Sequence, residues 1–113
     1  MAGLAAQLGV DVASRQTNHE GQLIEWVQDV PGKFDAVLIN PGAYTHTSIA
    51  LRDAIAAAGV PAVEVHLSNP SAREGFRHVS HLEGVSRARV AGFGKESYLL
   101  ALRGIVTLLA ERR

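Results

Sequence analysis

The stretch FDAVLINPGAYTHTSIALRDAIAAAGVPAVEVHLSN, from Phe34 to Asn69, carries the main signal for the fold class. It opens with an apolar run that ends at Asn40, continues with an alanine-rich helical pattern that Gly59 ends, and closes with the alternating run PAVEVHLSN. An all-apolar run suits a strand buried on both faces, and glycine suits the left-handed residue after a helix. A strand, a helix and a second strand in this order predict a parallel sheet covered by helices.

The sequence on the N-terminal side extends this pattern. Residues 1–9 have the character of the tail of a helix closed by Gly9, and Val10–Ala13 is expected to form a strand. The next helix is expected to begin at a capping box of Thr17 and Glu20, and to stop at the Pro-Gly pair of residues 31–32.

On the C-terminal side, residues 86–94 (SRARVAGFG) predict a last strand, and apolar residues at helical spacing predict a closing helix that ends near Arg112. No repeat or linker divides the chain, so residues 1–113 are expected to form a single domain.

Composition excludes several classes of protein. The 113 residues are 47% hydrophobic, have no net charge and include no cysteine, which predicts one small globular domain without disulfides or thiolate zinc sites. No apolar run reaches the roughly 18 residues of a membrane span, and no signal peptide is evident, so we expect a cytoplasmic protein. Neutral charge gives no general attraction to nucleic acid or membrane. A local basic patch remains compatible with it, formed by Arg73, Arg77, Arg87 and Arg89.

Polar residues follow three of the predicted strands. Asn40 and the segment PGAYTHTS follow one strand, His66 to Asn69 follow the next, and the GFG of residues 92–94 follows a third. In open α/β sheets, ligands bind beyond the carboxyl ends of the strands. If consecutive strands are neighbours, these loops share one mouth, which is where we expect the site.

The corner after Asn40 has two interpretations. Gly42 allows a close backbone approach to a ligand, and Thr45 or Thr47 can cap the following helix and leave His46 free to face the mouth. The alternative is that these residues only make a turn and a helix cap.

Glu64 and His66 lie two residues apart, so a strand places them on the same face. A carboxylate beside a histidine favours the imidazolium, which could act as a general acid. The alternative is a structural ion pair at the end of a sheet. The backbone amides of Leu67 and Ser68, with the Ser68 hydroxyl, could bind a carboxylate at this strand end.

Arg73 and Arg77 have helical spacing and suit an anionic or polyhydroxylated ligand, although most such arginines are solvated surface residues. His78 and His81 raise the idea of a metal site, but no carboxylate motif accompanies them, so no metal is expected. The GFG sequence lacks the remaining spacing of a dinucleotide fingerprint.

Six motifs follow one another along nearly the whole chain: RQTNHEG, NPGAYTHTS, LRDAI, PAVEVHLSN, AREGFRH, and GFG followed by SYLLAL. In their order and gaps they resemble the type II 3-dehydroquinate dehydratases. The resemblance implies a flavodoxin-like, three-layer α/β/α fold with a parallel sheet. It also implies a hydro-lyase that converts 3-dehydroquinate to 3-dehydroshikimate by anti elimination through an enolate, without a metal or organic cofactor. The implied assembly is a trimer-based homo-oligomer, such as a dodecamer.

The resemblance also assigns roles to single residues. It implies that His66 gives a proton to the departing hydroxyl, that Glu64 orients His66, and that Asp53 reaches into the site of an adjacent subunit. The remaining implied contacts are to ring hydroxyls, through Asn40, His46 and Arg77, and to the substrate carboxylate, through Leu67 and Ser68. Asn40 is counted among the catalytic residues with His66 and Glu64.

The sequence departs from the family pattern at its beginning, because it starts inside the family's first helix. The central first strand of the 2-1-3-4-5 sheet, the NGPN loop and the lid with its arginine and catalytic tyrosine are not part of it, and neither Tyr44 nor Tyr98 is an obvious substitute. A missing general base removes about 10² to 10⁴ in rate, so this chain alone is expected to be weak or inactive. We expect a truncated start, with a functional protein about thirty to forty residues longer.

The lysines give one check that is independent of the resemblance. Lys33 and Lys95 both lie away from the expected mouth, so an imine route is not favoured. Two alternatives to the enzyme stay open. One is a non-catalytic relative that binds a polyhydroxy carboxylate, and the other is a structural or regulatory module with no site. The sequence does not separate the shikimate pathway from quinate catabolism.

Overall fold

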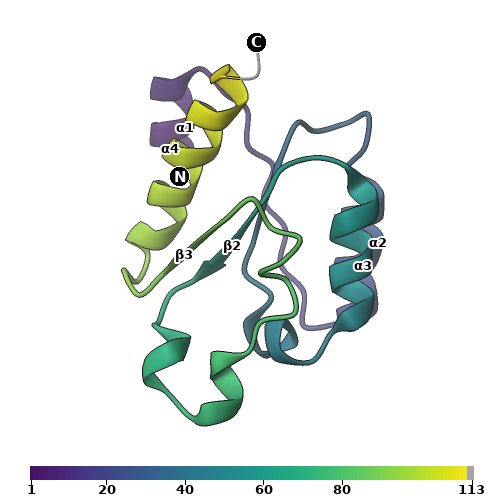
Figure 1. The fold of residues 1–113 in the computed structure, drawn as a ribbon. Coiled ribbons are helices and arrows are strands. Elements are labelled where there is room, and N and C mark those ends of the chain that lie inside the picture. The colour runs from purple at the N-terminus through teal and green to yellow at the C-terminus, as the bar shows by residue number, and fades with distance from the viewer. Residues whose placement is uncertain (112–113) are drawn as a thin grey trace.

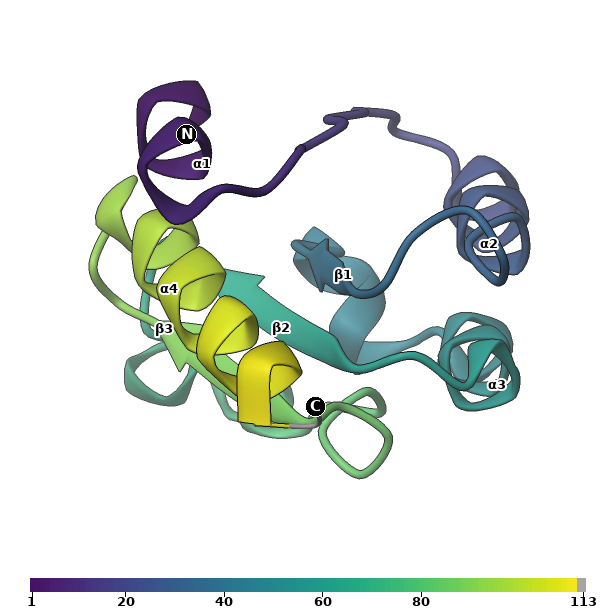
Figure 2. The same cartoon turned by 90° about the horizontal axis from the view of Figure 1, so that it is seen from above.

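The computed structural model describes residues 1–111 and contains one parallel sheet of three strands. The strands are β1 (Val37–Ile39), β2 (Ala62–His66) and β3 (Ala88–Ala91), in the order β1-β2-β3; Figure 1 labels β2 and β3, and Figure 2 also labels β1. Both pairs are parallel, and Glu64 of β2 lies opposite Ile39 on one side and Arg89 on the other. The predicted parallel sheet with neighbouring consecutive strands is therefore confirmed.

Four α-helices cover the two faces of this sheet. Helices α1 (Ala2–Leu8) and α4 (Glu96–Glu111) lie on one face, and α2 (Glu20–Gln28) and α3 (Ile49–Ala58) lie side by side on the other (Figure 2). This is the expected α/β/α class. The predicted end of the closing helix, Arg112, lies outside the described residues. Within residues 1–111, no helix combines the length and the apolar character needed to cross a bilayer.

The alternation of β2 divides the interior into two cores. Val63 and Val65 point to the α1 and α4 side, where they pack with Leu102 and Ile105. Ala62 faces the α2 and α3 side, where its neighbours in the core are Val27, Ile39, Leu51, Ala54, Ile55 and Leu82. All five residues of β2 are buried, so the central strand places Glu64 in the interior rather than in solvent.

The ends of the helices confirm some predictions and correct others. Gly59 ends α3 in the left-handed conformation (φ 71°), as expected. The cap at the start of α3 is Ser48, whose hydroxyl accepts a hydrogen bond from the Leu51 amide at 2.9 Å, so the expected cap at Thr45 or Thr47 is wrong. Thr17 does not cap α2 either. Its hydroxyl accepts from the amide of His19 at 3.2 Å, and the helix begins only at Glu20.

The strand expected at Val10–Ala13 is not formed. This segment belongs to the long connection between α1 and α2, which runs apart from β1 in Figure 2. Among residues 1–111, β1 pairs only with β2, so its outer edge bonds to no strand. An extended segment becomes a strand only when a neighbour satisfies its backbone groups, and within residues 1–111 no strand pairs with Val10–Ala13.

Candidate active site

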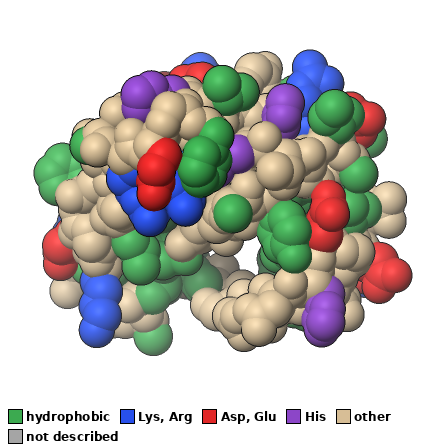
Figure 3. Space-filling view, turned by 90° about the horizontal axis from the view of Figure 1, so that it is seen from below, with side chains coloured by type: hydrophobic (Ala, Val, Ile, Leu, Met, Phe, Trp, Pro, Cys, Tyr) green, Lys and Arg blue, Asp and Glu red, His purple; other side chains and the backbone are tan. Residues whose placement is uncertain are grey.

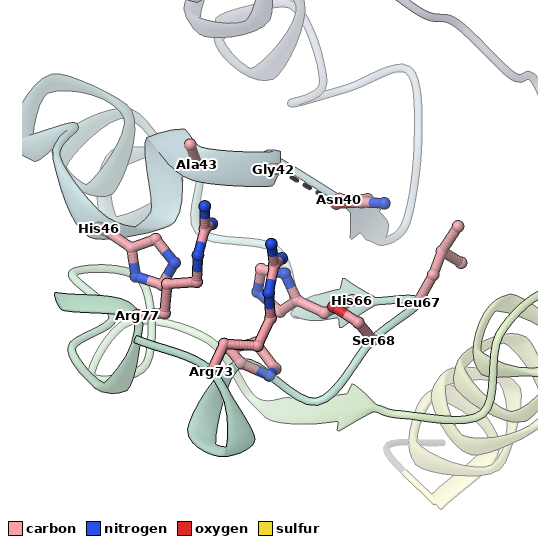
Figure 4. Close-up of a pocket in the computed structure, with 10 residues that line it drawn as sticks. Asn40, Gly42, Ala43, His46, His66, Leu67, Ser68, Arg73 and Arg77 are labelled. Carbon is pink, nitrogen blue, oxygen red and sulfur yellow. Dashed lines mark hydrogen bonds between the residues drawn. The ribbon is translucent and has the colours of Figure 1, made fainter. Parts of the chain in front are cut away.

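A cavity of about 280 Å³ opens at the carboxyl ends of β1 and β2. Three short 3-10 turns shape it: η1 (Gly42–His46), η2 (Pro70–Ala72) and η3 (Gly75–His78). Figure 3 shows several histidine side chains and a group of Lys or Arg side chains on the face of the molecule seen from below. Its volume suits a small ligand, near the lower end for pockets that hold small molecules. The lining residues are Asn40, Gly42, Ala43, His46, His66, Leu67, Ser68, Pro70, Arg73 and Arg77 (Figure 4).

Six of the residues to which the family resemblance assigned a role therefore meet in one pocket: Asn40, His46, His66, Leu67, Ser68 and Arg77. Asp53 does not join them. It lies on α3 with its side chain 66% exposed, 3.4 Å from the guanidinium of Arg52. The GFG loop does not line the pocket either, contrary to expectation. The amides of Gly92 and Gly94 instead donate to the carbonyls of His66 and Leu67, which supports the loop after β2 from behind.

Glu64 lies beneath the pocket and is fully buried. Its Oε2 atom receives hydrogen bonds from the Thr45 hydroxyl and from the Nε2 atom of His66, the latter at 2.5 Å. The Ser80 hydroxyl lies 2.8 Å from Oε1 and 3.0 Å from Oε2. A buried carboxylate is tolerated only when its oxygens are satisfied in this way. The sequence predicted the pair of Glu64 with His66 but gave no sign of Thr45 or Ser80 as partners.

The pKa of Glu64 lies below its ordinary value. Burial raises the pKa, and this is the largest single influence. The hydrogen bonds from His66, Thr45 and Ser80, together with the positive charge of Arg89, lower it and outweigh the effect of burial. Glu64 is consequently an anion at neutral pH, even though its side chain is shielded from water.

His66 connects this buried anion to the cavity. The ring is 7% exposed, its Nε2 atom is bound to Glu64, and its Nδ1 atom makes no hydrogen bond within the described residues. A carboxylate at one ring nitrogen fixes that N–H and the orientation of the ring, so exchange with a ligand is left to the other nitrogen. The geometry suits proton transfer at Nδ1 of His66.

The polar residues of η1 are also held in place. The Nδ1 atom of His46 donates to the carbonyl of Val79 at 2.6 Å, and the ring meets Phe76 edge to face at 6.0 Å. The carbonyl oxygen of the Asn40 side chain accepts from the Gly42 amide at 3.1 Å (Figure 4). Each side chain thus uses one polar atom internally and keeps the other for a ligand. Such groups suit the hydroxyls of a polyhydroxylated ligand.

Arg73 and Arg77 both line the pocket, but not as neighbours on a helix. The chain breaks into η2 and η3, so the expected helical pairing is wrong. Figure 4 shows both side chains extending from one wall of the pocket toward η1. The Nε atom of Arg77 lies 2.6 Å from Glu74, and its guanidinium stacks over Phe76 at 4.7 Å. Two guanidiniums beside polar groups favour an anionic ligand.

The tyrosines and lysines stay outside this pocket. The Tyr44 hydroxyl donates to the carbonyl of Asn18 at 2.9 Å. Tyr98 is part of α4 and packs against the core on that side of the sheet. Neither they nor Lys33 and Lys95 line the cavity. Across residues 1–111, His, Asp and Glu side chains do not gather in any group of three or more that could hold a metal ion.

Comparison with known proteins gives the family of this chain. The family model described as dehydroquinase class II matches residues 1–106. The chain is 57% identical over 103 residues to the 3-dehydroquinate dehydratase of Azorhizobium caulinodans, covering 91% of this chain and 69% of that protein. It is 54% identical over 105 residues to the 3-dehydroquinate dehydratase of Geotalea daltonii, covering 93% and 73%.

A solved structure gives the same result for the fold. The type II dehydroquinase from Propionibacterium acnes superposes with a TM-score of 0.87 at 38% identity, covering 94% of this chain and 80% of that one. A family match over nearly all of the chain, supported by relatives more than half identical, leaves one conclusion: this chain belongs to the class II dehydroquinase family.

Proposed function

We propose that this chain is a hydro-lyase that dehydrates 3-dehydroquinate to 3-dehydroshikimate, the reaction named for its relatives. The observation that carries the proposal is the bond between His66 and the buried Glu64 directly beneath a cavity lined by two arginines. This arrangement holds a proton donor against the floor of a pocket suited to a small polyhydroxylated acid. The shikimate pathway and quinate catabolism both use this reaction.

The proposed roles follow from the contacts of each residue. His66 gives the proton of Nδ1 to the departing hydroxyl, and Glu64 fixes the ring through Nε2. Leu67 and Ser68, at the exposed end of β2, take the substrate carboxylate through their backbone amides. The remaining groups, on Asn40, His46 and Arg77, hold the ring hydroxyls.

An enolate intermediate is the proposed route for the electrons. The proton beside the ketone passes to a general base, a role that the proposal assigns to no residue lining the cavity. The electron pair of the resulting enolate then forms the new carbon–carbon double bond as the hydroxyl leaves by anti elimination. The alternative imine route needs an amine in the site, and neither Lys33 nor Lys95 lines the cavity. No step of the proposal calls for a metal or organic cofactor.

The proposed assembly is a trimer-based homo-oligomer, such as a dodecamer, in the cytoplasm. Asp53 supports this proposal because its side chain is exposed and does not line the pocket of its own subunit. It lies on α3, one helical turn after the exposed Ile49. In the assembly, Asp53 completes the pocket of an adjacent subunit. That a further strand pairs with the outer edge of β1 stays a prediction, which the unpaired state of that edge supports.

A second function has one observation in its favour. Neither Tyr44 nor Tyr98 reaches the pocket, so a protein that binds the polyhydroxy carboxylate without turning it over is the competing proposal. Calorimetry with 3-dehydroquinate and a turnover assay separate the two, because only dehydration creates the conjugated product that absorbs in the ultraviolet.

A pair of variants tests the proposed role of the histidine. We expect His66→Ala to abolish turnover while 3-dehydroquinate still binds. His78→Ala is the matched control, because His78 is exposed and does not line the cavity. Full turnover by His66→Ala would contradict the proposed mechanism, and binding without any turnover by the unmodified chain would select the second function.

A further inference from the structure

Arg89 is a charged, largely buried residue beside the proposed catalytic pair of His66 and Glu64, and it does not line the cavity. It is the register partner of Glu64 across β2 and β3, so both side chains lie on the same face of the sheet. Its Nε atom lies 3.7 Å from Oε2 of Glu64. The side chain is only 22% exposed, and its Nε and Nη2 atoms are buried without a hydrogen-bond partner among the described residues.

The contacts of Glu64 show how Arg89 acts on it. The hydrogen bonds to the carboxylate already come from Thr45, Ser80 and His66, and the guanidinium of Arg89 is too distant to add another. An arginine that does not hydrogen bond cannot be what orients the carboxylate. Its influence is the positive charge that it holds at close range in a poorly hydrated place, where such interactions are strong.

We propose that Arg89 is a positioning residue for the dehydration: its fixed charge lets His66 release a proton while Glu64 stays an anion. This inference rests on the proposed function. In the step concerned, the proton moves from Nδ1 of His66 to the leaving oxygen. The carbon–oxygen bond breaks toward that oxygen to give water, and the enolate electron pair forms the carbon–carbon double bond.

The charges before and after this step explain the need for Arg89. Before proton transfer, the anion of Glu64 faces the imidazolium of His66. Afterwards His66 is neutral, and without Arg89 a buried carboxylate would be left with no positive partner, which is costly. The pair would then keep its proton. With Arg89 present, the carboxylate has a cation beside it both before and after the transfer.

The other charged groups near His66 do not take this place. Arg73, Arg77 and His46 border the cavity on the ligand side of the ring, and Arg77 is already paired with Glu74. Among the described residues, Arg89 is the one arginine or lysine with a nitrogen within 4.0 Å of a Glu64 oxygen. Its charge therefore acts on Glu64 from the side of β3, and Arg89 does not line the cavity.

The test is a pH titration of the ¹⁵N signals of the His66 ring in the whole chain. In Arg89→Met we expect the Glu64–His66 pair to lose its proton about one pH unit higher than in the unmodified protein. Arg89→Lys keeps the charge and should restore the original titration, because hydrogen-bond geometry is not involved. Arg87→Met is the matched control, since it removes an equal charge from an exposed position immediately before β3, two residues from Arg89.

Kinetics provide the second measurement. We expect Arg89→Met to lower kcat about tenfold with little change in KM, and to move the alkaline limb of the kcat profile upward. A titration of Arg89→Met that coincides with the unmodified protein overturns the inference, even if His66→Ala abolishes turnover. Should Arg89→Met not fold, Arg89→Gln takes its place with the same expected shift. Full turnover by His66→Ala overturns the proposed function instead, so the two failures are distinct.

Discussion

The substitution Thr45→Val tests the buried network around Glu64 without changing the shape of the core. Thr45 is fully buried, and its hydroxyl donates to Oε2 of Glu64 and lies 3.2 Å from the Ser80 hydroxyl. Valine has nearly the same volume, so the change removes one hydrogen bond to a charged acceptor and leaves no cavity. Such bonds contribute about 1.5–3 kcal/mol. We expect the free energy of unfolding to fall by about 2 kcal/mol, which lowers Tm by roughly 8 °C in a domain of this size.

The loss should depend on pH in a defined direction. Because the pKa of Glu64 is lower in the folded protein than in the unfolded chain, its ionised form stabilises the fold above the unfolded value of about 4.3. That stabilisation is lost as the pH falls through the folded value. Thr45→Val removes one of the hydrogen bonds that lower the pKa. The decrease in the free energy of unfolding that Thr45→Val causes is therefore largest at neutral pH and becomes smaller as Glu64 is protonated.

Urea unfolding followed by the fluorescence of Trp26, the single tryptophan, measures this cost at about pH 7 and at a series of lower pH values that passes through the folded pKa of Glu64. Thr47→Val is the matched control, because Thr47 is exposed and its hydroxyl makes no hydrogen bond within the described residues. Addition of Glu64→Gln should reduce the effect of Thr45→Val, since the charged acceptor is gone. A cost equal to that of the control, or one that does not shrink once Glu64 is protonated in the folded protein, would refute the reasoning.

Three further predictions concern the ends of α3 and the assembly. Ser48→Ala should lower the free energy of unfolding by about 1 kcal/mol, measured by urea unfolding, because the helix loses the side chain that caps it. Gly59→Ala should cost about 1–2 kcal/mol in the same assay, since alanine is strained at the left-handed φ of 71°, whereas Gly3→Ala should not destabilise. Asp53→Asn and His66→Ala should each lose turnover. Mixed oligomers of the two variants should regain part of it, because some sites in them contain both native residues. No recovery of turnover on mixing would argue against a site shared between subunits.

Local patterns in the sequence were sufficient for the centre of the fold. The period of two in β2 places Glu64 and His66 on one face of the sheet. Nε2 of His66 lies 2.5 Å from Oε2 of Glu64. The glycine after the alanine-rich run marked the end of α3 correctly. Loops that follow adjacent parallel strands had to lie at the same edge of the sheet, which is why Asn40 and Ser68 could be assigned to one pocket.

Features that depend on distant partners could not be predicted in the same way. Thr45 and Ser80 lie 19 and 16 residues from Glu64 in the sequence, and neither carries a local sign that it binds a carboxylate. The sequence indicates Arg89 only as part of a possible basic patch. Its place opposite Glu64 depends on the register of β2 and β3, which the structure defines. Val10–Ala13 has the composition of a strand, but a strand also requires a neighbour.

The uncovered edge of β1 has a practical consequence for work with the purified protein. On the edge that faces away from β2, no strand of residues 1–111 pairs with the backbone groups of the apolar run Val37–Ile39. An edge of this kind is a template on which another copy can add a strand, so wherever the predicted further strand does not cover it, we expect concentrated samples to aggregate into β-rich particles. Light scattering measures this aggregation. It should rise with protein concentration and fall when a charged residue replaces Leu38.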